Sequence, residues 1–259
     1  MRKNGGIIGP TNTPDATADD SAASGIWSLA EAKINVQNSK WPTPAPPIVA
    51  LINYENNWTI GSVGGQTATY DGTSGAWTTS IAKVGSRSLV NGSGDNYITL
   101  PYSLQNGGTI EAWFSWSGSQ SSGNDRMFEL GGDAVENGWS VFRDGSGRFT
   151  FRQTGSSGTA DAFTDQGSMT GVDVFYHIAY AYDFAPGGSG EFFFNGNRIS
   201  SAFTTVGNHS LTRLYIGTSS LSGYYFYGSI DAVRVTAGRK LYSGSTYTIP
   251  NPATWGLPS

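Results

Sequence analysis

Residues 109–117 read TIEAWFSWS, and their pattern indicates a β-strand. One set of alternate positions is apolar: Ile110, Ala112, Phe114 and Trp116. The other set is mixed: Thr109, Glu111, Trp113 and Ser115. Because successive strand side chains point to opposite faces, the pattern predicts one packed face and one partly wet face. Residues 174–183 show the same alternation.

Short β-prone runs of this kind recur through the chain from residue 48 onward. They are separated by clusters of Gly, Asn, Asp and Ser, a spacing typical of a sandwich or barrel. The predicted strands, besides 109–117, are 48–54, 96–100, 126–131, 138–143, 148–153, 174–183, 191–195, 198–203, 212–217 and 226–236. The low charged fraction of 13% and the 36 glycines also favour an all-β class.

Two tight turns define hairpins. Asn195 and Gly196 lie between an aromatic run and Ile199, and both residue types tolerate the positive φ that a two-residue hairpin turn requires. Residues 144–147, DGSG, predict a slightly longer hairpin. The run at 226–236 changes phase between Ile230 and Val233, which leaves two alternatives, a β-bulge or burial on both faces.

Five of these segments, in chain order, resemble strands of the laminin G-like, concanavalin A-like superfamily. They are 109–114 (its TIEAW strand), 127–131 (IFSLG), 176–180 (WHHIA), 190–196 (the LYVDG hairpin) and 227–235 (GYIDDVRI). The resemblance covers roughly residues 50–250 and implies a two-sheet antiparallel jelly-roll sandwich.

The first 47 residues differ in composition and predict a separate N-terminal arm. Residues 1–25 hold little to bury, and such segments gain order on a partner. Ser28 and Glu31 match a capping box that opens a short helix over about 28–38. The proline-rich stretch 43–47 reads as a stiff linker, so the predicted division is 1–47 and 48–259.

The arm resembles N-terminal segments of bacteriophage structural proteins, which implies a virion component. Trp27, Trp41 and Ile26 are then the expected contacts with a neighbouring virion protein in the capsid or tail. Packing of the two tryptophans on the sandwich is an equal alternative. The resemblance also implies a homo-oligomer, as a capsid decoration, head fibre or tail part.

Charge and cysteine content exclude several classes of function. The net charge of −4 and the scattered Lys and Arg argue against nucleic-acid binding. The absence of cysteine excludes disulfides and thiolate metal sites. No continuous apolar run follows Met1 as in a secretion signal, and none reaches membrane-spanning length, so we expect no membrane partner and synthesis in a host cytoplasm.

Catalytic apparatus is not evident in the sequence. A glycosidase needs two opposed carboxylates, and the acidic residues are isolated along the chain: Glu111, Glu129, Glu136, Glu191, Asp183 and Asp231. The favoured interpretation is that they solvate strands or orient turns. His177 is interpreted as structural and His209 as a loop residue. We therefore expect no enzyme activity and no cofactor, and a polysaccharide-degrading enzyme is the least favoured alternative.

Two ligand sites remain as hypotheses. Asp133 and Asn137 have oxygen ligands suited to calcium, as in laminin G-like relatives, although turn formation is the favoured interpretation. Tyr224 and Tyr225 follow Gly223, where a turn could expose a ring to a sugar. The main hypothesis is a virion structural protein, and the alternative is a carbohydrate-binding module for host surface glycans.

Overall fold

The computed structural model describes fifteen segments of the chain. They are residues 48–52, 60–61, 69–71, 77–91, 96–101, 107–118, 125–130, 138–155, 158–164, 171–183, 189–199, 203–204, 213–219, 224–238 and 240–255. All of them belong to one unit, Pro47–Ser259. The predicted arm with its helix at 28–38 lies outside the described residues, so the domain division stays a prediction.

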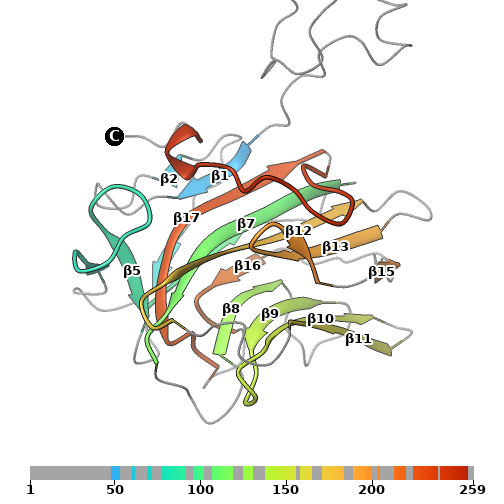
Figure 1. Cartoon of the computed structure of the whole chain (residues 1–259), viewed down its shortest axis with the longest axis horizontal. Coiled ribbons are helices and arrows are strands. Elements are labelled where there is room, and N and C mark those ends of the chain that lie inside the picture. The colour runs from blue at the N-terminus through green and yellow to red at the C-terminus, as the bar shows by residue number, and fades with distance from the viewer. Residues whose placement is uncertain are drawn as a thin grey trace, which may run out of the picture. The chain divides into compact units, whose positions relative to one another are not determined.

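The described residues form two antiparallel sheets, which confirms the predicted all-β sandwich (Figure 1). Sheet A contains β1 (Ile48–Ile52), β2 (Ile60–Gly61), β4 (Trp77–Thr78), β5 (Ser88–Asn91), β7 (Gly107–Trp116), β12 (Phe175–Asp183), β13 (Ser189–Phe194), β14 (Asn197–Arg198), β15 (Phe203–Thr204) and β17 (Gly228–Ala237). Its main path runs β14-β13-β12-β7-β17-β1-β2.

Sheet B lies opposite sheet A. It contains β3 (Thr69–Asp71), β6 (Tyr97–Pro101), β8 (Asp125–Leu130), β9 (Trp139–Arg143), β10 (Phe149–Gly155), β11 (Gly158–Phe163) and β16 (Arg213–Ile216). The strands follow the order β11-β10-β9-β8-β16-β6-β3. No described helix is long and apolar enough to cross a membrane, and the short 3-10 helix at Pro252–Thr254 is the only one described.

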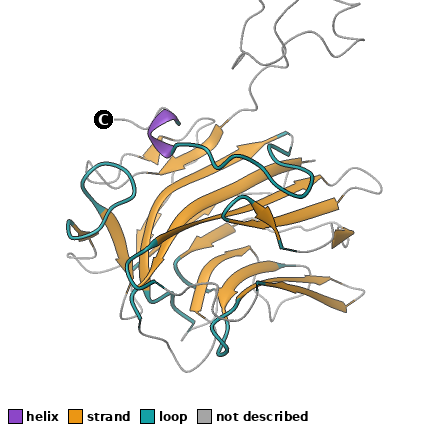
Figure 2. Ribbon diagram, viewed as in Figure 1, coloured by secondary structure: helices purple, strands orange, loops and turns teal. Residues whose placement is uncertain are grey.

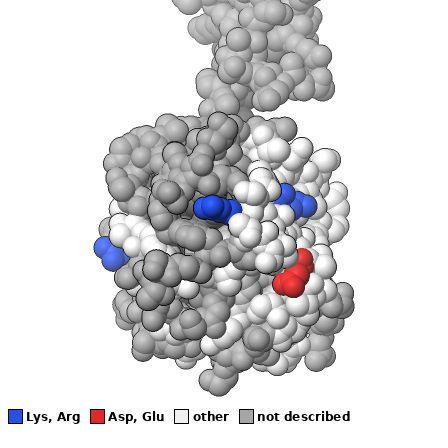
Figure 3. Space-filling view, turned by 90° about the vertical axis from the view of Figure 1, so that its left-hand side faces the viewer, with Lys and Arg blue, Asp and Glu red and all other residues white. Residues whose placement is uncertain are grey.

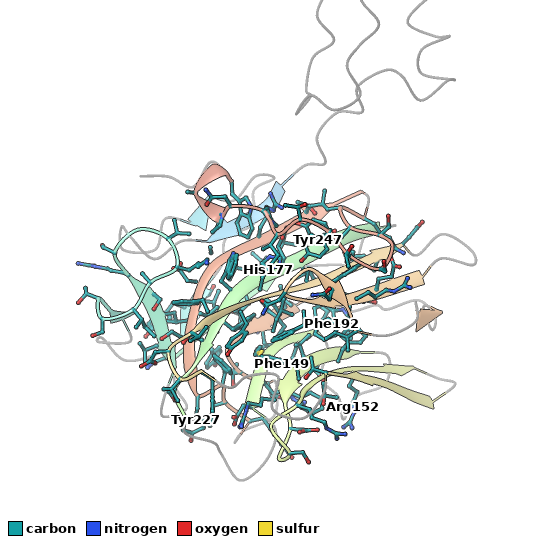
Figure 4. All side chains as sticks on the ribbon, in the orientation of Figure 1. Phe149, Arg152, His177, Phe192, Tyr227 and Tyr247 are labelled. Carbon is teal, nitrogen blue, oxygen red and sulfur yellow. The ribbon has the colours of Figure 1, made fainter. Side chains whose placement is uncertain are left out.

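Aromatic side chains fill the space between the sheets. Phe114 of sheet A meets Phe128 of sheet B edge-on, with ring centroids 5.1 Å apart. Phe151 of sheet B stacks on Phe192 of sheet A at 5.2 Å. Figure 4 shows Phe149 and Phe192 pointing into this interior. Burial of such rings supplies most of the driving force that holds the two sheets together.

Both predicted hairpins are present. Asn195 and Gly196 have φ values of 47° and 76°, as a two-residue turn between β13 and β14 requires. The second turn joins β9 to β10, where the Gly147 amide donates to the Asp144 carbonyl and Gly147 has a φ of 78°. The predicted single strand 198–203 is instead two short strands, β14 and β15, which pair with different parts of β13.

Strand β17 has both of the features predicted as alternatives for residues 226–236, a β-bulge and burial on both faces. Its register with β7 shifts between Asp231 and Arg234, and Ala232 has a φ of 49° in this bulge. All of its residues except Arg234 are also buried. The bulge reverses which side chains face the interior.

The prediction of a partly wet outer face on sheet A is wrong for its central strands. Glu111 of β7 and His177 of β12 lie on that face and are fully buried. Residues 240–255, which we call the C-terminal strap, run across it and end in the 3-10 helix (Figure 2). The strap therefore converts a half-wet sheet face into a second, smaller core.

Candidate functional site

Tyr224 and Tyr225 lie just before β17 and are both half-buried. The start of β17 pairs with Trp116 at the end of β7. The Tyr227 carbonyl accepts hydrogen bonds from Ser117, and Figure 4 shows Tyr227 at this end of the sandwich. The two predicted tyrosines therefore lie at one end of the two sheets.

Two arginines of sheet B lie at the same end, on β8 and β9. We call this region the arginine rim, and define it by Trp116, Asp125, Arg126, Phe142, Arg143 and Tyr224. Strand pairing places Asp125 beside Arg143 on one face of sheet B and Arg126 beside Phe142 on the other, because Asp125 pairs with Arg143 and Arg126 with Phe142. The sequence contains no signal for this cluster, since its members are far apart along the chain.

Arg126 connects the predicted Tyr224 to sheet B. Its guanidinium carbon is 4.2 Å from the centroid of the Phe142 ring and 5.4 Å from that of Tyr224. Both distances are within the range of a cation–π interaction. Arg126 is fully buried, so its charge is held between the two rings while Tyr224 stays partly exposed.

Glu129 lies beside Arg126 and is also fully buried. One of its carboxylate oxygens is 3.6 Å from Nε of Arg126, and it accepts a 2.6 Å hydrogen bond from the Ser219 hydroxyl. The predicted role of Glu129 as a solvated strand residue is wrong. Glu129 therefore supplies a buried negative charge beside the Arg126 guanidinium.

Arg143 completes the rim. Its guanidinium carbon lies 4.0 Å from the Trp116 ring centroid, and Nη1 is 3.8 Å from a carboxylate oxygen of Asp125. Burial lowers the pKa of the Arg143 guanidinium, and the Asp125 and Asp144 carboxylates only partly oppose this change. The arginine rim thus contains two buried cations, each packed on aromatic rings.

A second polar cluster lies beneath the C-terminal strap on the other sheet. Its centre is Glu111, whose Oε1 accepts hydrogen bonds from Nε and Nη2 of Arg234 at 2.7 and 2.6 Å. Its Oε2 accepts from the Tyr242 hydroxyl at 2.6 Å and lies 3.1 Å from Nε2 of His177.

His177 joins this cluster to Tyr247 (Figure 4). The Tyr247 hydroxyl is 2.7 Å from Nδ1 of His177. The Glu111 carboxylate can only accept, so Nε2 donates to it, and the Tyr247 hydroxyl is the partner of Nδ1. Both ring nitrogens of His177 therefore have a hydrogen-bond partner.

The Glu111 cluster shifts the pKa values of its members. Burial by itself would raise the pKa of Glu111, but the hydrogen bond from His177 and the charge of Arg234 outweigh it and lower the pKa. Burial and the Glu111 charge raise the pKa of Tyr242. Burial, with smaller contributions from Tyr242 and Glu111, raises that of Tyr247. The carboxylate stays ionised and the tyrosines stay protonated.

This arrangement makes the Glu111 cluster structural. Glu111 already accepts bonds on both oxygens, so it has no proton to give and little capacity to take one. The prediction that Glu111 and Glu191 solvate strands is wrong, and Glu191 instead binds Arg198 and Lys240. Asp231 accepts from the Lys83 and Val84 amides, which agrees with the predicted alternative of a carboxylate that orients a turn. His177 has the structural role that the sequence favours.

Several predicted site residues lie outside the described part of the chain. They are Trp27, Trp41, Ile26, Asp133, Asn137, Glu136 and His209. Within the described segments, no three His, Asp or Glu side chains are grouped as a metal site would require. On the face in Figure 3, the described Lys and Arg side chains lie apart and form no continuous basic patch.

Comparison with known proteins gives a match over the sandwich. The family model described as the concanavalin A-like lectin/glucanases superfamily matches residues 91–239. No curated protein matches the chain in sequence.

Solved structures share the fold at low sequence identity. The botulinum neurotoxin serotype D binding domain superposes with a TM-score of 0.56 at 9% identity, over 75% of this chain and 49% of that chain. The binding domain of Paraclostridial Mosquitocidal Protein 1 gives 0.56 at 12% identity, over 75% and 49%. The chain spans about half the length of these domains. At such identities the likeness shows the fold alone.

Proposed function

Because the chain belongs to the concanavalin A-like lectin/glucanases superfamily, we propose that it is a non-enzymatic module that binds carbohydrate at the arginine rim. The observation that carries this proposal is the packing of Arg126 between Phe142 and the partly exposed Tyr224. Sugar sites combine an aromatic surface for the ring with a few fixed polar groups for the hydroxyls. Tyr224 and Tyr225 supply the aromatic surface, and the buried Arg126 supports the Tyr224 ring from within the domain.

The covering of sheet A also favours a binding site at the arginine rim. The outer face of sheet A is covered by the C-terminal strap, and its charged groups bind one another. A ligand would have to displace the strap to reach them. The strap does not cover the arginine rim, where three side chains stay partly exposed: Tyr224, Tyr225 and Trp116.

The structural neighbours support a binding role. They include binding domains of toxins, and one of them, botulinum neurotoxin type C, depends on interaction with two ganglioside molecules to enter cells. That structure is 11% identical to this chain. Engagement of Glu111 within its own cluster also argues against its use as a catalytic acid or base.

A glycan array with the full chain, with and without calcium, tests this function. We expect hits that Tyr224→Ala weakens about fivefold or more, since stacking on an aromatic ring is worth ~1 kcal/mol beyond burial. Tyr97→Ala is the matched control, because Tyr97 is half-buried like Tyr224 but lies on β6. An array without hits, or equal effects of the two variants, would contradict the proposal.

We also propose that the arm of residues 1–47 attaches the module to other virion proteins as part of a homo-oligomer. The arm composition supports this, and so does the position of the rim. Ile48, where the described domain begins, pairs with Thr236 at the far end of β17, whereas the rim adjoins Gly228. At ~3.3 Å per residue these points are about 26 Å apart along the strand, so the rim is displayed away from the arm's attachment point.

Deletion of residues 1–42 tests attachment separately from sugar binding. We expect the shortened protein to keep its melting temperature and glycan binding but to be missing from assembled particles. Normal incorporation of the shortened protein would overturn the attachment role and leave the carbohydrate-binding role unaffected. Cross-linking of Trp27 and Trp41 variants in particles would identify the neighbour.

A further inference from the structure

Residues 171–174, GVDV, form a turn that leads into β12, and we call this turn the valine loop. Val172 and Val174 are 52% and 48% exposed, and no other large apolar side chain that the structure describes is exposed to this extent. Single exposed apolar side chains are common on protein surfaces. The concentration of both on one short turn indicates a contact with an apolar group.

Backbone hydrogen bonds fix the valine loop at the end of sheet A. Val172 forms an isolated parallel bridge with Trp116, the last residue of β7, and the Asp173 amide donates to the Trp116 carbonyl at 2.9 Å. The Gly171 amide donates to the Tyr176 hydroxyl oxygen at 3.0 Å. The loop is therefore held in place before a ligand arrives, which removes part of the entropic cost of binding.

Asp173 lies between the two valines and has a φ of 61°. Asp tolerates this left-handed conformation better than most residues, but Gly adopts it without steric cost. The Asp173 side chain is exposed and makes no hydrogen bond with another described residue. The turn itself therefore does not require the carboxylate, which remains as a hydrogen-bond acceptor between two apolar side chains.

The valine loop lies at the same end of the sandwich as the proposed carbohydrate site. Trp116 pairs with Val172 on one side and with Gly228 of β17 on the other. The carbonyl of the neighbouring Tyr227 accepts hydrogen bonds from Ser117. Two strand spacings place Gly228 about 10 Å from the valine loop, a span that an oligosaccharide covers.

The size and charge of the valine loop favour a small substituent of a ligand over a macromolecular partner. Two valines expose far less than the ~800 Å² that each side of a stable protein interface buries. The phosphates of a lipid surface would repel the Asp173 carboxylate. An N-acetyl group, in contrast, combines a methyl group, which packs on valine, with an amide N–H, which donates to a carboxylate.

We propose that the valine loop binds the N-acetyl group of an amino sugar. The methyl group packs on Val172 and Val174, and the amide N–H donates to the Asp173 carboxylate. The inference rests on the proposed carbohydrate-binding function and names a ligand class, N-acetylated saccharides, at a subsite beside the arginine rim. A hexose with a hydroxyl in place of the N-acetyl group keeps a donor for Asp173 but loses the methyl contact.

Pairs of oligosaccharides that differ only in an N-acetyl or a hydroxyl group at one carbon test the inference on the full chain. We expect the N-acetylated member to bind about fourfold tighter, the factor that burial of one methyl group supplies. Val172→Thr keeps the branched shape of the side chain but replaces a methyl by a hydroxyl, so it should remove most of this preference. Val172→Ile is the matched control and should retain it.

Asp173→Gly separates the polar contact from the apolar one. Glycine adopts a φ of 61° without strain, so the turn should be retained, and an unchanged melting temperature verifies this. We expect the affinities for both members of each pair to fall about tenfold, because the lost acceptor is charged. The preference for the N-acetylated member should persist in this variant.

The outcomes separate this inference from the function on which it rests. An array without any hit overturns both. Equal binding of the two members of each pair, or tighter binding of the corresponding free amine, overturns the role of the valine loop and retains the carbohydrate-binding function. A preference that Val172→Thr leaves intact also overturns that role. If Val172→Thr does not fold, Val174→Thr makes the same comparison.

Discussion

The Tyr247 hydroxyl makes a 2.7 Å hydrogen bond with Nδ1 of His177 and joins the C-terminal strap to strand β12. The two residues are 70 positions apart in the chain. His177 in turn contacts Glu111 of β7, so a single side chain of the strap completes a buried hydrogen-bond chain on sheet A. The strap is therefore an integral part of the sandwich.

Tyr247→Phe should lower the free energy of unfolding by about 1–3 kcal/mol, because it leaves a buried ring nitrogen without its hydrogen-bond partner. Urea unfolding followed by circular dichroism measures the change. Tyr70→Phe is the control, since it removes a bond to Asn96, which is half-buried, whereas His177 is fully buried. Equal losses in the two variants would contradict the network described for Tyr247.

Glu111→Ala should be more damaging than Tyr247→Phe. Removing the carboxylate leaves Arg234 and His177 beneath the strap without their acceptor, and breaking a buried pair in this way costs about 3–5 kcal/mol. Thermal unfolding and binding of a hydrophobic dye report the loss of stability and the release of the strap. A variant that melts within a few degrees of the unsubstituted protein would show that the Glu111 cluster does not hold the strap.

Stability should fall in acid. The Glu111 pKa is lower in the folded protein than in the unfolded chain, so its contribution is complete above the unfolded value of 4.5 and is lost as the pH falls through the folded value. Asp144 acts in the same direction, because bonds from Arg148 outweigh the effect of burial and lower its pKa. Melting temperatures measured from pH 6 down to pH 2 should therefore decline below about pH 4.5, and less steeply in Glu111→Gln.

Gly196→Ala should destabilise the protein, whereas Gly145→Ala should have almost no effect. A Cβ at Gly196 would lie 2.6 Å from the Tyr247 carbonyl oxygen, and the residue has a φ of 76°. A Cβ at Gly145 would meet nothing within 4 Å. The expected loss in the free energy of unfolding for Gly196→Ala exceeds the ~1 kcal/mol that a positive φ alone costs an alanine, because the strap must also shift. Equal melting temperatures of the two variants would disprove the close contact.

Excess chelator should leave the melting temperature unchanged. Asp133 and Asn137, the sequence-based calcium candidates, are not among the described residues, and the proposed site at the arginine rim needs no metal. Differential scanning calorimetry with and without added calcium makes the comparison. A rise in melting temperature with calcium would establish a metal site, because a ligand that binds the folded state stabilises it.

The sequence alone determines the local structure of this protein. Period-two patterns predict β7 and β12, and the Asn195 and Gly196 turn predicts a hairpin that the structure contains. Each of these features depends on neighbouring residues only, on side-chain alternation and on the φ values that a turn requires. The change of phase in residues 226–236 left a bulge and burial on both faces as alternatives, and the structure contains both, with the bulge at Ala232.

Only the tertiary structure decides which polar residues are buried. Glu111 and Glu129 have the spacing of solvated strand residues, but the strap covers the first, and the second binds Ser219 from 90 positions away. Likewise, Arg126 meets Tyr224 and Arg143 meets Trp116 through tertiary contacts that no sequence motif predicts. A period-two pattern shows which side chains share a face of a strand, whereas what covers that face depends on contacts between distant parts of the chain.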